Sequence, residues 1–279
     1  MIDLHSHTDQ SDGTFSPAEL VAEARRIGLE AFAITDHDSF RGYDQAVPLA
    51  REAGLELICG IELSTKYEGS SIHLLAYFPG QLPSQEFRDW LELVLDGRRD
   101  RNRRLIEKLR SLGIDITLAE VEAKGRTLTA RPHFGAVLVE KGYAKDMQDA
   151  FDQYLDESGK GYVQRQEVPI DEGIGRVLRA GGLPSLAHPV RVFKGDRAQL
   201  EPCVEDLVGM GLKAIEVIHS DHSAENTAYY HTLAERHGLA KTGGSDFHGL
   251  NKPHISLGTG LKNNISVPYA MLESLKQLA

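Results

Sequence analysis

The chain has 279 residues, enough for one large α/β domain or for a domain that carries an insertion. Hydrophobic residues make up 41% and charged residues 26% of it, as in ordinary globular proteins, and the net charge of −10 argues against a non-specific DNA-binding module with a basic face. Two cysteines are too few for a disulfide framework, no apolar run approaches the roughly 18–20 residues that span a bilayer, and the N-terminus has none of the regions of a signal peptide. We therefore expect a cytoplasmic protein without membrane contact.

The first dozen residues contain a candidate metal-binding pattern. His5 and His7 stand at the end of a predicted strand, where side chains two residues apart point to the same face. Asp12 can approach the same ion from the loop that follows. Neutral imidazole and carboxylate are ligands of zinc, iron and manganese. Two histidines at this spacing can equally have a purely structural role, so other parts of the sequence must show whether they bind metal.

Alternating strand and helix patterns follow and indicate parallel βα units. Predicted strands over residues 30–35, 55–60 and 71–78 accompany predicted helices over residues 16–28 and 42–53. In barrels and open sheets built from such units, the chemistry collects at the carboxyl ends of the strands. His37 and Glu62 follow the second and third strands, as His5 and His7 follow the first. The recurrence of ligand types at equivalent positions strengthens the metal-site interpretation.

Residues 84–112 carry apolar side chains at helical spacing and predict one long helix. Arg98 and Asn102 project onto its apolar stripe, and Arg99 and Arg101 flank that stripe. Polar groups on a buried face need partners, and guanidinium is suited to bidentate phosphate contacts. We therefore expect these residues to recognise a phosphate group.

Residues 113–166 combine short helical patterns, more charge and little strand propensity, which indicates a helical insertion. Arg131 and His133 stand at the start of one of its helices, where exposed N–H groups favour anions. The βα rhythm resumes at about residue 168, and polar ligand types again follow its strands, at His188, Asp246 and His248. His219 ends a further strand, which needs no functional explanation.

Taken in order, these motifs resemble the polymerase and histidinol phosphatase (PHP) superfamily over nearly the whole chain. The motif residues are Asp3-Leu-His5-Ser-His7-Thr8, Thr35-Asp-His37-Asp38, Gly60-Ile-Glu62, His73, Ala187-His188-Pro189 and Gly244-Ser-Asp246-Phe-His248. The arginine cluster and Arg131-Pro-His133 resemble the branch of 3′,5′-nucleoside bisphosphate phosphatases, which includes 5′-to-3′ exoribonucleases. The resemblance implies an α/β fold, a distorted (β/α)7 PHP barrel formed by residues 1–99 and 167–279. Residues 100–166 would form a small helical insertion domain that contributes to substrate binding.

The resemblance also implies a centre of two or three divalent metal ions, most often Mn²⁺, with Fe²⁺ and Zn²⁺ as the other candidates. One ion would be held by His5, His7, Glu62 and Asp246. A second would be held by Asp12, His37, His188 and His248, and a third would share Glu62 and use His73 and His133. Catalytic roles would belong to Asp12, His37, Glu62 and Asp246.

The implied reaction is hydrolysis of the 3′-phosphate of a nucleoside 3′,5′-bisphosphate by a hydroxide that bridges the ions. Substrate would contact Asp12, His37, Arg98, Arg99, Arg101, Asn102 and Arg131. The expected partners are a small nucleotide and short RNA ends, the latter cleaved as by a 5′-3′ exoribonuclease, with no obligate protein partner. Two alternatives stay open. One is a phosphatase for a smaller monoester such as histidinol phosphate, against which the arginine cluster argues, and the other is a non-catalytic, metal-stabilised interaction module.

Overall fold

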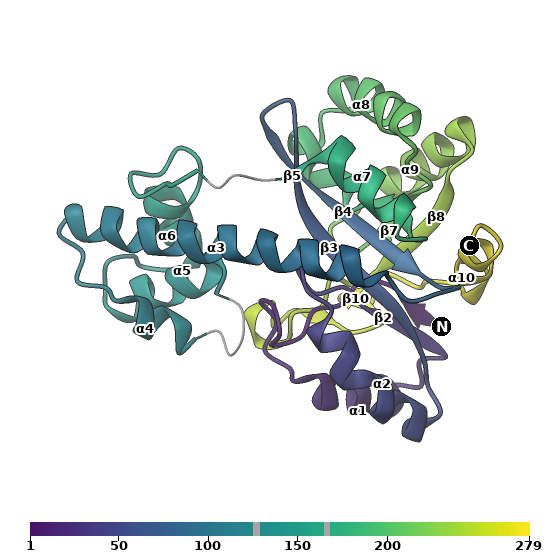
Figure 1. The fold of residues 1–279 in the computed structure, drawn as a ribbon, viewed down its shortest axis with the longest axis horizontal. Helices are drawn as coiled ribbons and strands as arrows, with labels where there is room; N and C mark the ends of the chain where they lie inside the picture. The colour runs from purple at the N-terminus through teal and green to yellow at the C-terminus, as the bar shows by residue number, and fades with distance from the viewer. Residues whose placement is uncertain (125–128, 165–167) are drawn as a thin grey trace.

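A computed structural model describes residues 1–124, 129–164 and 168–279 and shows a barrel with a helical extension (Figure 1). The strands of the barrel are β1 (Ile2–Asp3), β2 (Ala31–Ile34), β3 (Glu56–Tyr67), β4 (Ser70–Phe78), β6 (Leu183–Leu186), β7 (Ala214–His219) and β8 (Ala240–Gly244). They follow one another in that order around the sheet, and β5 (Val168–Pro169) pairs with β3. Backbone hydrogen bonds from Leu4 to Gly243 (3.1 Å) and from His7 to Phe247 (2.9 Å) join the segments that begin with the first and last strands. The expected distorted barrel of seven strands is confirmed.

Helices cover the outside of the barrel. They are α1 (Pro17–Arg26), α2 (Arg41–Ala53), α7 (Ile170–Arg179), α8 (Arg197–Met210), α9 (Ala224–His237) and α10 (Tyr269–Lys276). Local sequence begins the first of them, because Ser16 and Glu19 form a capping box around the exposed N–H groups of α1. Near the C-terminus, a short β9 (Ile255–Ser256) pairs antiparallel with β10 (Gly260–Leu261). Among the described residues, the structure contains no helix with the length and apolar character of a membrane span.

One strand departs from the parallel arrangement that the βα rhythm predicts. β4 runs antiparallel to both of its neighbours, β3 and β6. β3 and β4 are joined directly by Glu68 and Gly69, both of which have positive φ. A two-residue connection of this kind closes a hairpin, whereas parallel neighbours need a crossover of a dozen or more residues. The hairpin is the distortion in this barrel, and it brings His73 on β4 beside Glu62 on β3.

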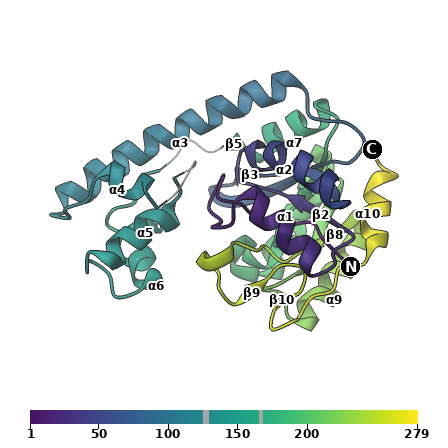
Figure 2. The same ribbon diagram turned by 90° about the horizontal axis from the view of Figure 1, so that it is seen from below.

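The long helix α3 (Gln85–Ser111) has two halves with different partners. Phe87, Trp90 and Leu91 in its first half belong to the core of the barrel. Leu105 and Leu109 in its second half belong to a separate apolar core. Figure 2 shows α3 passing over both parts of the molecule. The single helix expected over residues 84–112 is therefore present, and it carries the extension.

The extension contains α4 (Leu118–Glu122), α5 (Arg131–Glu140), α6 (Met147–Ala150) and a π-helical turn, η1 (Phe151–Leu155). Its buried residues, Ile116, Val121, Phe134, Leu138 and Leu155 among them, form the second core with the end of α3. The expected start of the insertion after residue 99 lies between the two halves of α3. Its expected end at residue 166 lies outside the described residues.

Candidate metal centre and substrate cavity

Histidines and carboxylates converge inside the barrel, beyond the carboxyl ends of its parallel strands. The residues of this centre are His5, His7, Asp12, His37, Glu62, His73, His188, His219, Asp246 and His248, and all except His73 are buried. They come from segments spread over most of the chain, so only the closed barrel assembles them. Four groups of ligand atoms lie close enough to hold an ion in common.

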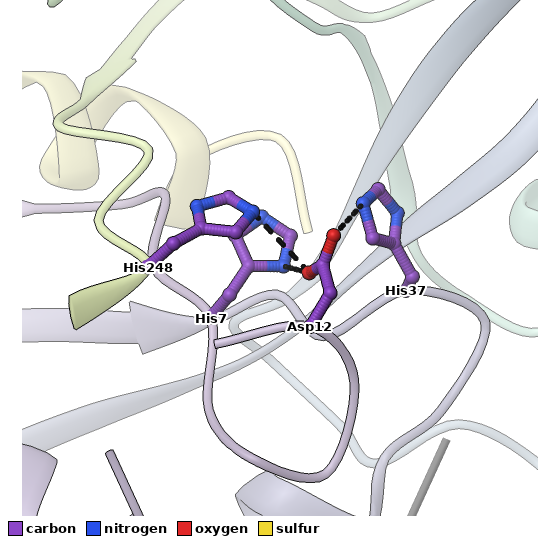
Figure 3. A group of neighbouring side chains, drawn as sticks. All are labelled: His7, Asp12, His37 and His248. Atoms are coloured by element: carbon purple, nitrogen blue, oxygen red, sulfur yellow. Dashed lines mark ion pairs between the residues drawn. The ribbon is translucent and has the colours of Figure 1, made fainter. Parts of the chain in front are cut away.

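One group surrounds Asp12 (Figure 3). Its Oδ1 lies 3.2 Å from His248 Nε2 and 3.6 Å from His7 Nδ1, and its Oδ2 lies 3.7 Å from His37 Nε2. Asp12 thus reaches the centre from the loop after β1, as expected. Both oxygens of its carboxylate face imidazole nitrogens.

Two further groups share Glu62 on β3. Its Oε1 lies 2.8 Å from His73 Nδ1 and 2.9 Å from His188 Nε2. Its Oε2 lies 3.1 Å from His7 Nε2 and 3.4 Å from both His5 Nε2 and His37 Nδ1. A carboxylate placed between so many nitrogens can bridge two ions.

Asp246 completes the centre from the loop after β8. Its Oδ1 lies 3.4 Å from His7 Nε2 and 3.5 Å from His5 Nε2. Its Oδ2 accepts from Lys252 Nζ at 2.6 Å and lies 2.9 Å from Arg191 Nη2. One oxygen therefore faces the histidines while the other is bound by two cationic side chains.

The protonation states of this centre suit divalent cations. Burial opposes the ionisation of Asp12, yet the neighbouring imidazoles of His248 and His37 hold its pKa well below the usual value. Burial also opposes the protonation of His7, yet hydrogen bonds to Asp246 and Glu62 raise its pKa to about 9. The carboxylates thus draw positive charge into the centre. Divalent ions supply such charge, and they bind ionised carboxylates and neutral imidazoles.

Unshared ring nitrogens point to the same conclusion. His37 Nδ1 and His188 Nδ1 are buried and have no hydrogen-bond partner among the described residues. A buried polar atom without a partner is costly, and each unprotonated imidazole nitrogen is a donor for a first-row metal. Burial lowers the pKa of His37 to about 3, which keeps its ring in the neutral form that binds metals. The residues present fit a divalent metal centre.

Ligand-bearing loops at the strand ends adopt unusual backbone conformations. His188 has φ 25°, Asp246 has φ 57°, and Asp38, next to His37, has φ 52°. Residues other than glycine seldom occupy this left-handed region, and such strain collects at functional sites.

A cavity of about 470 Å³ opens above the centre, between the barrel and the extension. The floor of the cavity, toward the candidate metal ligands, is lined by Asp12, His37 and His73. Its walls carry four arginines, Arg98, Arg101, Arg131 and Arg191. The extension closes it with Pro132, Phe151, Asp156, Tyr162 and Val163. The cavity therefore places cationic side chains between a metal-binding floor and a partly aromatic wall.

The structure separates the residues of the predicted phosphate-binding cluster. Arg98 and Arg101 are buried and line the cavity. Arg99 points away from it and pairs with Asp96 at 2.6 Å on an exposed face of α3. Asn102 is buried, and its Nδ2 donates to the carbonyl of Thr129 at 2.8 Å. A helical projection of the sequence shows only the faces of one helix. It does not show where the extension packs, so it could not distinguish these environments.

Three of the expected ligand assignments differ from the geometry. His7 was expected with His5, Glu62 and Asp246, but it lies in the group of Asp12. His188 was assigned with Asp12, but it lies with His5 and Glu62. His248 remains with Asp12, and His37 contacts both Asp12 and Glu62. His133 belongs to none of the groups found among the described residues. Its Nδ1 accepts the N–H of Ala130 at 2.9 Å, so a neutral ring carries its proton on Nε2 and has no free lone pair for an ion.

Sequence reasoning missed several residues around the centre. Glu216 and His219 on β7 enter it, and Arg191 and Lys252 bind Asp246. In the sequence alone, His219 is only the end of a predicted strand. The sequence gives only weak signs of these roles: Glu216 interrupts an apolar strand, and Arg191 follows the His188-Pro189 motif by two residues.

Comparisons with known proteins identify the family of the chain. The family model of the PHP domain matches residues 3–164. The 3′,5′-nucleoside bisphosphate phosphatase of Chromobacterium violaceum is 32% identical over 250 residues, which cover 88% of this chain and 87% of that protein. The 5′-3′ exoribonuclease Rnm of Salmonella typhimurium is 35% identical over 267 residues, covering 93% of this chain and 88% of that protein.

A solved structure extends the likeness to three dimensions. It is the crystal structure of a protein described as a metal-dependent phosphoesterase from Bifidobacterium adolescentis, with 32% sequence identity and a TM-score of 0.84. The match covers 98% of this chain and 94% of that one, so it includes barrel and extension alike. The resemblance drawn from the ordered motifs is therefore confirmed: the chain belongs to the PHP domain family.

Proposed function

We propose that the chain is a metal-dependent phosphoesterase that removes the 3′-phosphate of nucleoside 3′,5′-bisphosphates. The observation that carries the proposal is the cavity itself, which joins a buried His/Asp/Glu centre to arginines contributed by α3 and the extension. Relatives named as a nucleoside bisphosphate phosphatase and as an exoribonuclease, both at least 32% identical, support it. We extend the proposal to stepwise hydrolysis of short 5′-phosphorylated RNA, which presents the same pair of phosphates.

Two or three ions, for which we propose Mn²⁺, would be held by His7, Asp12, His37 and His248, by His5, Glu62, His188 and Asp246, and by Glu62 with His73. When bound, such ions supply an activated water near neutral pH and neutralise phosphoryl charge. Glu62 would contribute to two of these ligand groups, and Asp12 would face the reacting phosphate from the rim of the cavity. Asp12, His37, Glu62 and Asp246 remain the proposed catalytic residues.

The side chains above the centre would bind the phosphate that is not cut. Arg101 and Arg131 line the cavity on the side of the extension. Arg191 lines it on the side of the barrel, where its guanidinium also pairs with Asp221 and Asp246. Guanidinium groups bind phosphate through two parallel N–H donors, so such a set favours a substrate with two phosphates over a simple monoester. Arg98 would contribute less to phosphate binding, because its guanidinium already donates to Asp38 and Ser64.

The extension would receive the nucleoside. Phe151 and Tyr162 give this wall of the cavity an aromatic character, and Phe151 begins the π-helical turn η1. Bases stack on aromatic faces whatever their identity. A substrate whose cut phosphate lies at the metal floor and whose second phosphate lies among the arginines would place its base toward this wall. We propose the cytoplasm, where nucleotides are turned over, as the location.

Phosphate release from adenosine 3′,5′-bisphosphate by Mn²⁺-loaded protein tests the proposal, with 3′-AMP, 5′-AMP and histidinol phosphate measured alongside. We expect a strong preference for the bisphosphate, with 5′-AMP as product. A preference for histidinol phosphate would show that the arginines do not select a second phosphate. Full metal content without hydrolysis of any of these esters would favour the interaction module instead.

A further inference from the structure

β7 contains an irregularity that changes which of its side chains enter the barrel. Glu216 pairs with Thr242 and Ile218 pairs with Gly243, so Val217 is an extra residue in the register with β8. On a regular strand, Glu216 and His219 would point to opposite faces, because they are an odd number of residues apart. The bulge brings both into the metal centre, where both are fully buried. Bulges occur next to active sites, where they redirect side chains.

Glu216 contacts two of the candidate ligands from behind. Its Oε1 lies 3.0 Å from His5 Nδ1, and its Oε2 accepts the backbone N–H of His188 at 2.6 Å. Because the carboxylate can only accept, His5 carries a proton on Nδ1, and the neutral ring then presents an unprotonated Nε2 to Glu62 and Asp246. The second hydrogen bond holds His188 in its left-handed conformation, with φ 25°. The carboxylate of Glu216 thus fixes both the tautomer of His5 and the left-handed backbone of His188.

His219 lies close enough to His5 and Asp246 to share an ion with them, but its hydrogen bond favours a tautomer that does not bind metal. Its Nδ1 accepts the backbone N–H of Asp221 at 3.0 Å. A neutral ring that accepts at Nδ1 carries its proton on Nε2, and Nε2 is the atom that faces Asp246, 3.5 Å from Oδ2. A protonated ring nitrogen offers no lone pair to a metal. Nε2 makes no hydrogen bond among the described residues, and the nearest carboxylate that a small shift of the ring would let it donate to is the outer oxygen of Asp246.

We propose that Glu216 and His219, brought into the barrel by the bulge of β7, are positioning residues that orient three metal ligands and do not themselves bind metal. Glu216 orients His5 and His188, and His219 orients Asp246. The inference rests on the proposed metal centre and not on the proposed substrate. Partners of metal ligands of this kind, when changed, typically cost about 10–100-fold in metal affinity.

The Glu216→Gln variant tests the first half of the proposal. Glutamine has one acceptor oxygen for two N–H donors, so either His5 or His188 loses its partner. We expect Mn²⁺ and Zn²⁺, titrated against a chromogenic chelator, to bind one site about 10–100-fold more weakly, with the other ions retained. Glu172→Gln, the same change on the exposed face of α7, is the matched control. Wild-type affinity in Glu216→Gln would overturn the assignment.

A purely structural role for Glu216 would lower the stability of the metal-free protein without changing relative ion affinities. Urea unfolding of the metal-free variant separates that result from the proposed one. If Glu216→Gln does not fold, Glu216→Asp keeps the charge but is too short to reach both donors, and the same selective loss is expected. The visible spectrum of Co²⁺-loaded protein provides a second readout, because it reports the geometry of the ligands around the ion.

His219→Gln and His219→Leu test the second half. Glutamine retains a donor for Asp246 and an acceptor for the N–H of Asp221, so we expect it to bind the wild-type number of ions. Leucine removes both, and we expect about tenfold weaker binding with the number of ions unchanged. Loss of one ion from His219→Gln would show that His219 is a ligand, and wild-type affinity in His219→Leu would show that it does not orient Asp246. Either result would overturn the assignment, whatever substrate the enzyme hydrolyses.

Discussion

Arg98 of α3 donates to one oxygen of Asp38 through both Nε, at 2.9 Å, and Nη2, at 2.5 Å. Both side chains are buried. The other oxygen of Asp38 accepts the backbone N–H of Ser64 at 2.8 Å, and the hydroxyl of Ser64 contacts Arg98 at 2.6 Å. The three residues connect α3 to the ends of β2 and β3. They hold the helix that carries the extension beside the metal centre.

Replacing Arg98 by alanine should therefore destabilise the protein. The change leaves the carboxylate of Asp38 buried and without its cation, which typically costs about 3–5 kcal/mol. Urea unfolding of Arg98→Ala, Asp38→Asn and the double variant measures the effect, and the double variant should lose less than the sum of the single changes. An unchanged free energy of unfolding in Arg98→Ala would contradict this account of the pair.

Arg101 and Arg99 form a matched pair for testing the phosphate-binding cluster. Arg101 lines the cavity, whereas Arg99 lies outside it beside Asp96. Loss of a hydrogen bond to a charged group costs about 1.5–3 kcal/mol, so Arg101→Ala should lower kcat/KM for the bisphosphate about 10–100-fold. Arg99→Ala should leave it unchanged. Equal losses on the bisphosphate and on a chromogenic monoester in Arg101→Ala would show that Arg101 does not hold the second phosphate.

Asp246→Asn should abolish turnover and leave the fold intact. The amide keeps the shape of the side chain but removes the charge that faces His5 and His7. It also leaves Lys252 and Arg191 without their shared carboxylate oxygen. Phosphate release together with far-ultraviolet circular dichroism measures the two properties separately. Wild-type rates in this variant would refute a catalytic role for Asp246.

Removal of metal should lower the thermal stability of the protein. An ion that binds only the folded state stabilises it by about 2.7 kcal/mol at a hundredfold excess over Kd. Without ions, the carboxylates of Asp12, Glu62 and Asp246 remain crowded in a buried centre. We expect chelator to lower Tm by several degrees and added Mn²⁺ to restore it, with Asp246→Asn responding less. A Tm that is independent of metal would argue against the centre.

The two cysteines should be unreactive in the folded protein. Burial raises the pKa of Cys203 to about 12 and also raises that of Cys59, and both thiols are free. Since only the thiolate reacts, an aromatic disulfide reagent at pH 8 should label neither thiol until the protein unfolds. Rapid labelling of the native protein would show that one of these segments opens readily.

The sequence by itself determined the ligand types and their order. His5, His37, Glu62 and Asp246 could be found because polar residues interrupt apolar strands at the positions where chemistry collects in βα folds. Helix ends could be found for a similar reason, since the capping box at Ser16 depends on neighbours only three residues away. These features depend on residues close together in the sequence, so they can be predicted from the sequence alone.

Only the tertiary structure decided which residues meet. Helical projection placed Arg98 on an apolar stripe, but its partner Asp38 is 60 residues away. The grouping of His188 with His5 and Glu62 depends on the antiparallel strand β4 and on a left-handed turn. Glu216 and His219 both enter the centre because β7 contains a single extra residue. This residue shifts the side chains that follow it to the opposite face, whereas a prediction from the sequence assumes regular alternation. Such contacts arise from the closure of the barrel and the packing of α3, where small changes in register move a side chain from one face to the other.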